Sequence, residues 1–101
     1  MIDIQKQETF DRVVLVINII LDVMQEKDKT KRPIIHMNSD LYEDLGIDSL
    51  ETLDLLNGLE EEFGVNPDQY EAVSKHKIFE IVDYIIELKE RQKRKVDKSK
   101  V

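Results

Sequence analysis

The sequence contains no cysteine among its 101 residues. A disulfide framework and a thiolate metal site are therefore excluded, and any thiol chemistry has to come from a cofactor. This composition favours an intracellular, cytoplasmic protein. Stretches rich in proline or glycine and longer than a turn are also absent. A chain of this length and composition fits one domain with one modest core.

Long apolar runs are absent as well. The longest, residues 13–17, is far too short to cross a bilayer. We therefore expect no targeting segment and no integral membrane segment. No segment alternates apolar and polar residues for long enough to make a convincing strand. The sequence therefore predicts an all-α fold.

Positive charge is missing from the middle of the chain. No Lys or Arg lies between Arg32 and Lys75, whereas eleven Asp and Glu residues do. Such a surface repels nucleic acid and attracts basic patches on proteins, so we expect basic protein partners and no nucleic acid. Composition alone leaves a merely solvated acidic face equally open.

Apolar residues at helical spacing predict the long helices. A stripe with steps of three and four places the first helix at about residues 7–25. The same pattern predicts a second helix from Asp48 to Gly64, a residue typical just beyond a helix end, and a last helix over 78–88. The first helix has further apolar residues on its other side, and we expect them to be buried: Leu15, Val16, Ile19 and Val23.

The remaining segments are short or irregular. Pro33 and the charged residues before it begin a long loop that ends near Ile47. Within it, Ser39 or Asp40 can cap a single helical turn. Residues 67–72 predict a short third helix with Pro67 in its first turn.

We expect one folded domain at residues 1–90 and a basic, disordered tail at 91–101. Residues 89–101 carry seven Lys and Arg against two acidic residues. The residues leave the role of this tail open between contact with an anionic membrane or acidic partner and simple solubility.

Ser49 stands where the long loop gives way to the second helix. A serine in a first helical turn lies near unpaired backbone amides and the positive end of the helix dipole, which suits a phosphate ester. Spacing alone leaves another interpretation open, because Ser49 can act simply as a cap. Asp48 and Glu51 would stabilise the same helix end.

Three motifs in register resemble the acyl carrier protein family: Asp44-Leu45-Gly46, Asp48-Ser49-Leu50 and Leu59-Glu60-Glu61-Glu62-Phe63. The resemblance covers roughly residues 39–86 and, less specifically, the first helix. It implies a four-helix bundle with a short third helix. It also implies that a phosphopantetheinyl transferase attaches 4'-phosphopantetheine from coenzyme A to Ser49, with Asp48 and Leu50 beside the arm.

The resemblance implies a monomeric carrier rather than an enzyme. The arm of such a carrier holds acyl intermediates as thioesters and presents them to fatty acid or related biosynthetic enzymes. The acidic second helix would dock onto basic patches around enzyme active sites through Glu51, Asp54, Glu60 and Glu61. The acyl chain would be sheltered by Leu50, Leu53, Leu59, Phe63, Ile81 and Ile85. From the residues alone, this apolar set is explained simply as core.

Asn57-Gly58 departs from the family pattern, since relatives of the fatty acid type usually have an apolar residue followed by a small one. Gly58 costs up to about 1 kcal/mol relative to alanine inside a helix, so it either permits close packing or lowers local stability. Together with the basic tail, this departure leaves open a specialised aminoacyl or polyketide carrier. An unmodified acidic module that binds proteins is the alternative from another class.

Other site chemistries fail on spacing. When Gly46 is placed at position six of an EF-hand loop, Leu41 falls first and Thr52 last, and neither can supply the required carboxylate. His36 and His76 lack the spacing of metal ligands. No Gly-x-Ser-x-Gly elbow surrounds Ser49. We therefore predict no metal site and no catalytic residue.

Overall fold

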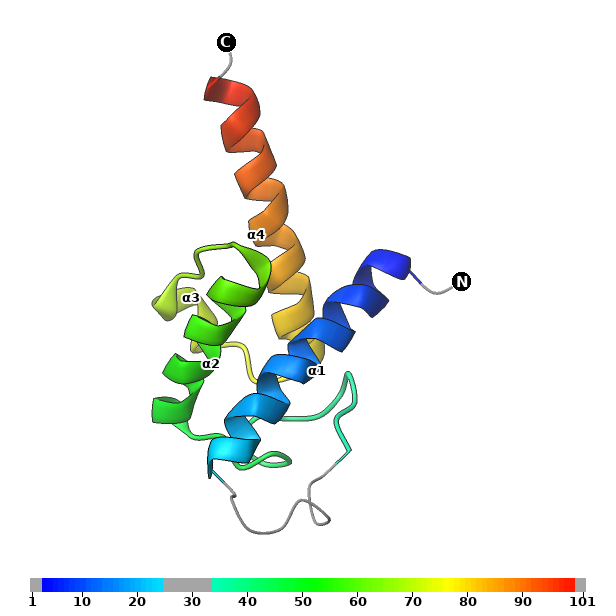
Figure 1. The fold of residues 1–101 in the computed structure, drawn as a ribbon, viewed down its shortest axis with the longest axis vertical. Coiled ribbons are helices and arrows are strands. Elements are labelled where there is room, and N and C mark those ends of the chain that lie inside the picture. The colour runs from blue at the N-terminus through cyan, green and yellow to red at the C-terminus, as the bar shows by residue number, and fades with distance from the viewer. Residues whose placement is uncertain (1–2, 25–33, 100–101) are drawn as a thin grey trace.

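The computed structural model describes residues 3–24 and 34–99, and the side chains of 3–23 and 34–93. Within these residues four helices and no strand are assigned: α1 (Ile4–Met24), α2 (Ser49–Phe63), α3 (Gln69–Ala72) and α4 (Ile78–Ser99). Figure 1 shows α1, α2 and α4 packed together, with α3 in the connection from α2 to α4. The predicted all-α bundle, with a short third helix and a long loop between the first two, is confirmed.

Helix α1 is built around a single buried face. Val13, Ile17 and Leu21 repeat every four residues and are fully buried, as expected for the core-facing stripe of an amphipathic helix. The Asp3 carboxylate accepts the amide of Gln5 at 3.0 Å. This local cap explains why α1 begins at Ile4, earlier than the predicted start near residue 7.

The opposite face of α1 does not follow the prediction. Leu15, Ile19 and Val23 are 60%, 62% and 73% exposed, whereas Val16 is buried. The expectation that all four are covered is therefore wrong for three of them. The physical reason is that the helix packs on α2 and α4 along one side, and no other described element lies over the far side.

The loop before α2 is pinned to the core by Leu41, Leu45 and Ile47, which are all buried. The predicted helical turn is a hydrogen-bonded turn without helix. Its Asp40 carboxylate accepts the amides of Tyr42 at 2.8 Å and Glu43 at 3.0 Å. The Glu43 amide is the main cause that lowers the pKa of Asp40. The backbone of Asp40 also forms an isolated bridge with Lys77, just before α4.

Helix α2 runs between two residues that the sequence identified. Asp48 is its N-terminal cap, and Gly64 closes it with φ of 67°, a left-handed conformation that glycine adopts without strain. At Gly58, an added Cβ would lie 2.7 Å from Val16 Cγ1 of α1. The alternatives left open at Gly58 are thereby resolved in favour of close helix packing.

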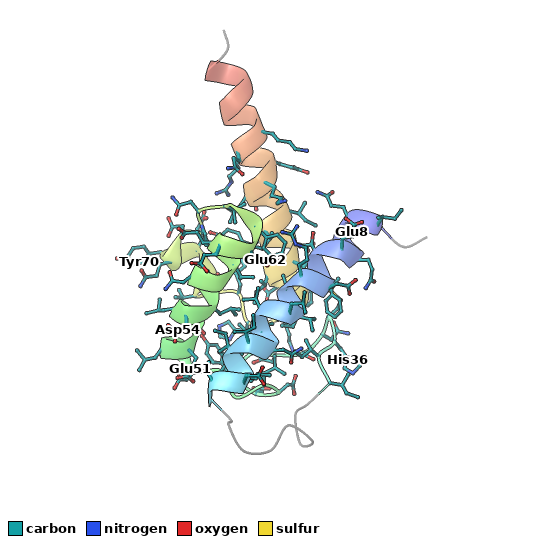
Figure 2. The ribbon with its side chains drawn as sticks, viewed as in Figure 1. Glu8, His36, Glu51, Asp54, Glu62 and Tyr70 are labelled. Carbon is teal, nitrogen blue, oxygen red and sulfur yellow. The ribbon has the colours of Figure 1, made fainter. Side chains whose placement is uncertain are left out.

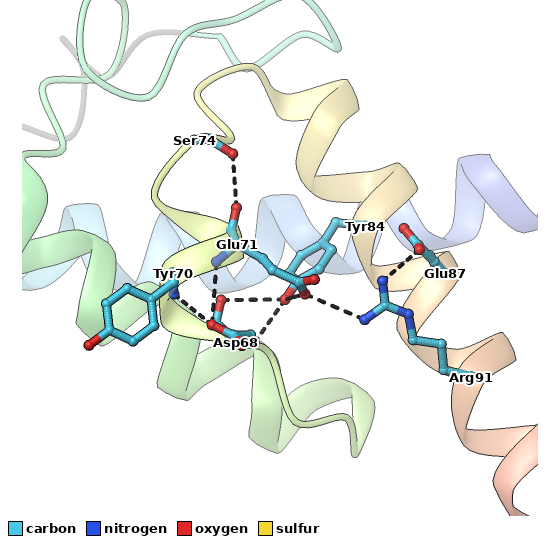
Figure 3. A network of polar contacts seen from close by, with 7 residues as sticks. All are labelled: Asp68, Tyr70, Glu71, Ser74, Tyr84, Glu87 and Arg91. Carbon is cyan, nitrogen blue, oxygen red and sulfur yellow. Dashed lines mark hydrogen bonds and ion pairs between the residues drawn. The ribbon is translucent and has the colours of Figure 1, made fainter.

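Helix α3 is held in place by side chains. The Asp68 carboxylate accepts the amide of Tyr70 at 2.7 Å, so Asp68 is the cap and Pro67 lies before the helix, not in its first turn as predicted. Figure 3 shows Tyr84 of α4 in contact with Asp68 and Glu71, at the start of α3 and within it. Its hydroxyl accepts the Asp68 amide at 2.8 Å and donates to Glu71 at 3.0 Å. Burial, first, and the neighbouring Glu71 carboxylate raise the pKa of Tyr84, although the hydrogen bond with the Asp68 backbone acts in the opposite direction.

Helix α4 is longer than the sequence indicated. The last buried residue among its described side chains is Leu88, but the helix continues to Ser99 and crosses the expected boundary at residue 90 without a break. The backbone of 91–99 therefore differs from the disordered tail that we expected. Lys, Arg and Gln are good helix formers, and Arg91 pairs with Glu87 at 2.7 Å one turn earlier. No helix among the described residues is long and apolar enough to span a membrane.

Candidate functional site

The start of α2 is built by reciprocal capping between Asp48 and Glu51. The Asp48 carboxylate accepts the amides of Leu50 at 2.9 Å and Glu51 at 3.0 Å. In return, the Glu51 carboxylate accepts the Asp48 amide at 3.2 Å. This capping box uses only residues that are neighbours in sequence. The Glu51 amide, the largest cause, and the Leu50 amide lower the pKa of Asp48.

Ser49 is the first residue of α2 and its side chain is exposed. The alternative in which Ser49 serves as the cap is wrong, because Asp48 fills that role. The expectation of unpaired amides around Ser49 is also partly wrong, since the Asp48 carboxylate accepts the amides of Leu50 and Glu51. Among the described residues, neither the amide nor the hydroxyl of Ser49 forms a hydrogen bond.

The other described serines are in different situations. Ser39 is buried, and its hydroxyl oxygen accepts the His36 amide at 2.8 Å. The Ser74 hydroxyl donates to the carbonyl of Glu71 at 3.0 Å. Ser49 is thus the one serine, among those whose side chains are described, with an exposed hydroxyl that has no partner. Its oxygen can be esterified by a phosphate that carries a bulky group, without any loss of packing.

The predicted docking carboxylates lie along α2. Asp54, Glu60 and Glu61 are exposed and have no cationic partner among the described residues. Glu51 is half-buried because it belongs to the capping box. Figure 2 shows Glu51 and Asp54 near the start of α2, and Glu62 near its other end. Glu62 is paired with Arg12 of α1 at 2.8 Å.

The structure does not bring the six predicted pocket residues together. Four of them belong to the buried core: Leu59, Phe63, Ile81 and Ile85. Leu50 is 71% exposed and Leu53 is 36% exposed, so neither lies inside. Both come from the first two turns of α2.

Sequence reasoning missed the hollow between α2 and α3. It has a volume of about 350 Å³ and is lined by Leu53, Leu56, Asn57, Glu60, Pro67 and Gln69. Leu56 belongs to the apolar period of α2, which was a usable signal. Asn57 was recognised only as a departure from the family pattern. Its place in the hollow was not predictable, because nothing in the sequence shows that α3 lies opposite it.

Comparison with known proteins decides the family. The sequence model of the phosphopantetheine attachment site matches residues 17–85. That match contains the whole of α2, including its exposed serine. The chain belongs to the acyl carrier protein family.

Individual carriers support the assignment. The acyl carrier protein of Rickettsia bellii is 36% identical over 70 residues, which cover 69% of this chain and 81% of the relative. That of Campylobacter fetus is 37% identical over 70 residues, with 69% and 91% covered. Acyl carrier protein 1 of Spinacia oleracea, a chloroplastic protein, is 32% identical over 87 residues, which cover 86% of this chain and 58% of the relative.

These likenesses establish the general function. The protein tethers acyl intermediates as thioesters on a 4'-phosphopantetheine prosthetic group, which supplies the thiol that a chain without cysteine lacks. A carrier of this kind interacts with a transferase that loads the group and with enzymes that process the acyl chain. The predicted family and cofactor are therefore confirmed.

Proposed function

We propose that Ser49 is the residue that carries the 4'-phosphopantetheine arm. The observation that supports this is the exposed hydroxyl of Ser49 at the first position of α2, which forms no hydrogen bond with any residue that the structure describes. A transferase can reach this oxygen without unfolding the helix, because Asp48 and Glu51 hold the helix start by themselves. The carboxylate of Asp48 and the exposed side chain of Leu50 flank the attachment point.

The chain contributes positioning and recognition rather than catalysis. The capping box fixes the first turn of α2, and with it the position of the Ser49 side chain from which the arm would extend. Acid, base and nucleophile for acyl transfer would come from the enzymes that the carrier visits. Fatty acid or related biosynthesis in the cytoplasm, by a monomeric carrier, is the setting we propose.

The docking surface we propose is the exposed acidic face of α2, in which Asp54, Glu60 and Glu61 have no ion-pair partner among the described side chains. Glu51 also belongs to this surface, although its carboxylate is partly occupied by the helix cap. Leu50 and Leu53 add exposed apolar surface beside these charges. A surface of this kind attracts basic patches at a distance and releases them quickly, because each exposed ion pair is weak.

For the acyl chain, we propose a shelter behind α2 formed by Leu59, Phe63, Ile81 and Ile85. These side chains belong to one contiguous apolar cluster. Leu53 lines the hollow between α2 and α3, so it stands where a chain from Ser49 would enter. Leu50 faces solvent in this structure.

Intact-protein mass spectrometry tests the attachment site. The full chain is incubated with coenzyme A and a broad-specificity phosphopantetheinyl transferase. Wild type should gain the mass of one phosphopantetheine group, and Ser49→Ala should gain none. Ser74→Ala is the matched control because Ser74 is also exposed, and it should be modified like wild type.

Each outcome separates a different possibility. Modification of Ser49→Ala would show that another residue carries the arm. Absence of modification in wild type with several transferases, each active on another carrier, would favour an unmodified interaction module. Circular dichroism of Ser49→Ala should match wild type, since the exposed hydroxyl makes no hydrogen bond among the described residues.

The docking surface is tested by the salt dependence of the transferase reaction. At low salt, Glu60→Gln/Glu61→Gln should lower kcat/KM by roughly threefold to tenfold, because two charges that steer encounter are lost. The difference should shrink at high salt. Glu8→Gln/Glu43→Gln removes the same charge from exposed sites outside α2 and serves as control. Equal losses in both variants would show that net charge, and not this face, governs docking.

A further inference from the structure

The end of α4 is anchored where it leaves the bundle. Arg91 lies 3.4 Å from Glu71 of α3 and 2.7 Å from Glu87 of α4 (Figure 3). The Gln92 side chain donates to the carbonyl of Gly64, just after α2, at 3.1 Å. Through Arg91 and Gln92, which are adjacent in sequence, these contacts tie α4 to α3 and to the end of α2. The direction of the helix beyond Gln92 is therefore set by the bundle.

Beyond this anchor, α4 continues as a basic stalk, which we define as residues 93–99. Figure 1 shows this part of α4 extending past the other helices. Its sequence contains Lys93, Arg94, Lys95 and Lys98 against one acidic residue, and Val96 is its one apolar residue. Among the described side chains of α4, which end at residue 93, the last buried one is Leu88. With a single apolar residue, the stalk sequence has little to offer a core, so charge is its main chemical property.

Charge is separated along the molecule. The stalk leaves beyond the C-terminal end of α2, whereas Ser49 stands at the N-terminal end, on the opposite side of the bundle (Figure 1). Residues 33–74 contain eleven acidic residues and no Lys or Arg. A partner attracted by the stalk would therefore contact the end of the molecule away from Ser49 and leave the attachment site accessible.

The composition of the stalk favours a broad anionic surface as its partner. It has no aromatic residue that could stack on a base, and too little apolar surface for insertion into a membrane. Clustered Lys and Arg bind anionic lipid headgroups through nearly additive attraction. Seven helical residues span roughly 10 Å, about one Debye length at physiological salt, so the acidic bundle would be screened from the same surface.

We propose that the basic stalk holds the protein on an anionic lipid surface, with the Ser49 end directed away from that surface. The stalk would be attracted to the lipid, while the acidic bundle stands about one Debye length away, where its repulsion is largely screened. The attraction of the stalk therefore orients the molecule. This proposal does not depend on the identity of the modified serine. Membrane contact of this type is peripheral and reversible, and it is weakened by salt.

Vesicle flotation with the full chain tests the proposal. At low salt, the protein should float with vesicles that contain phosphatidylcholine and about 30% phosphatidylglycerol, as an experimental choice within the range where basic clusters bind. It should not float with phosphatidylcholine alone. Arg94→Gln/Lys95→Gln/Lys98→Gln should lower the partition coefficient about 100-fold, since each basic residue contributes roughly fivefold. Glutamine keeps helix propensity, so the backbone should stay helical.

The matched control is Lys27→Gln/Lys29→Gln/Lys31→Gln, which changes the net charge equally at a distant point in the sequence. It should retain most of the binding, and so should Ser49→Ala. Equal losses in the two triple variants would overturn the stalk as the contact. Equally tight binding of a duplex oligonucleotide would overturn the preference for lipid. A stalk-dependent dimer in sedimentation equilibrium would identify a second copy of the chain as the occupant instead.

Discussion

The two ends of α2 are held by different kinds of contact. At the N-terminal end, Asp48 and Glu51 cap the helix with groups no more than three residues apart. At the C-terminal end, Arg12 lies 4.4 Å from the ring centroid of Phe63, and Gln92 binds the carbonyl of Gly64. The first end depends on local sequence alone, whereas the second adds contacts from α1 and α4 to its local glycine cap.

This difference separates presentation from anchoring within one helix. Side chains at the N-terminal end, such as Ser49 and Leu50, are exposed and available to a partner. Side chains further along, such as Leu55 and Leu59, are buried. A carrier needs both properties, because it must offer an attachment point to many enzymes while keeping one fold. Substitutions at exposed and at buried positions of α2 test this comparison.

The largest effect on stability is expected at Leu55, which is fully buried. Leu55→Ala should lower the free energy of unfolding by about 2–5 kcal/mol, because it leaves a cavity in the core. Leu50→Ala changes the same residue type on the same helix at 71% exposure, and should change stability by less than about 0.5 kcal/mol. Chemical denaturation of both variants gives the measurement. Similar losses would contradict the division between exposed and buried positions of α2.

A smaller effect is expected at Gly58, where α1 and α2 approach closely. An added methyl group would lie 2.7 Å from Val16 Cγ1, and overpacking costs about 1–3 kcal/mol. Alanine gains up to about 1 kcal/mol of helix propensity, so Gly58→Ala should be destabilising by roughly 1 kcal/mol net. A double-mutant cycle with Val16→Ala provides the test. Additive losses in the cycle would show that the two sites are not coupled.

The smallest of the three effects is expected at Asp48 and should depend on pH. The folded-state pKa of Asp48 lies below its usual value of 3.8, so its contribution is complete above that pH. It is lost as pH falls through the folded pKa. Asparagine caps equally well but does not titrate. The melting temperature of wild type should therefore fall more steeply than that of Asp48→Asn on acidification below pH 4.

Thermal unfolding followed by circular dichroism between pH 2 and 7, a range around the usual carboxyl pKa, gives this measurement. Asp54→Asn is the control, because Asp54 is an exposed carboxylate of α2 outside the cap. Parallel curves for wild type and Asp48→Asn would contradict the capping interpretation.

Sequence predicted the local features well. The bounds of α2 followed from Asp48 and Gly64, because a cap and a left-handed glycine depend on a few neighbouring residues. The exposure of Leu15 and Ile19 was not predictable from periodicity, since a helix with apolar residues on two sides gives no indication of which side is covered. The length of α4 was missed for a related reason, because helix propensity continues past the last residue with core contacts.

The candidate site shows the same division. A local motif predicted the serine at the start of α2. Which residue caps the helix was not predicted: the Asp48 carboxylate, and not Ser49, accepts the amides of Leu50 and Glu51. The hollow near Asn57 requires α3 to face α2, which is a tertiary relation. The acidic docking set was predicted as four equivalent residues. The structure distinguishes Glu51, which supports the helix cap, from the other three.

The position of Tyr84 has an optical consequence. The chain contains no tryptophan and three tyrosines, so its near-ultraviolet absorption and fluorescence come mainly from phenol rings. The Tyr84 hydroxyl reaches across to α3, and its surroundings raise its pKa above the usual phenol value. Departure of α3 from α4 would expose this ring to water and shift its ionisation to lower pH. The protein thus contains a built-in spectroscopic reporter for its shortest helix.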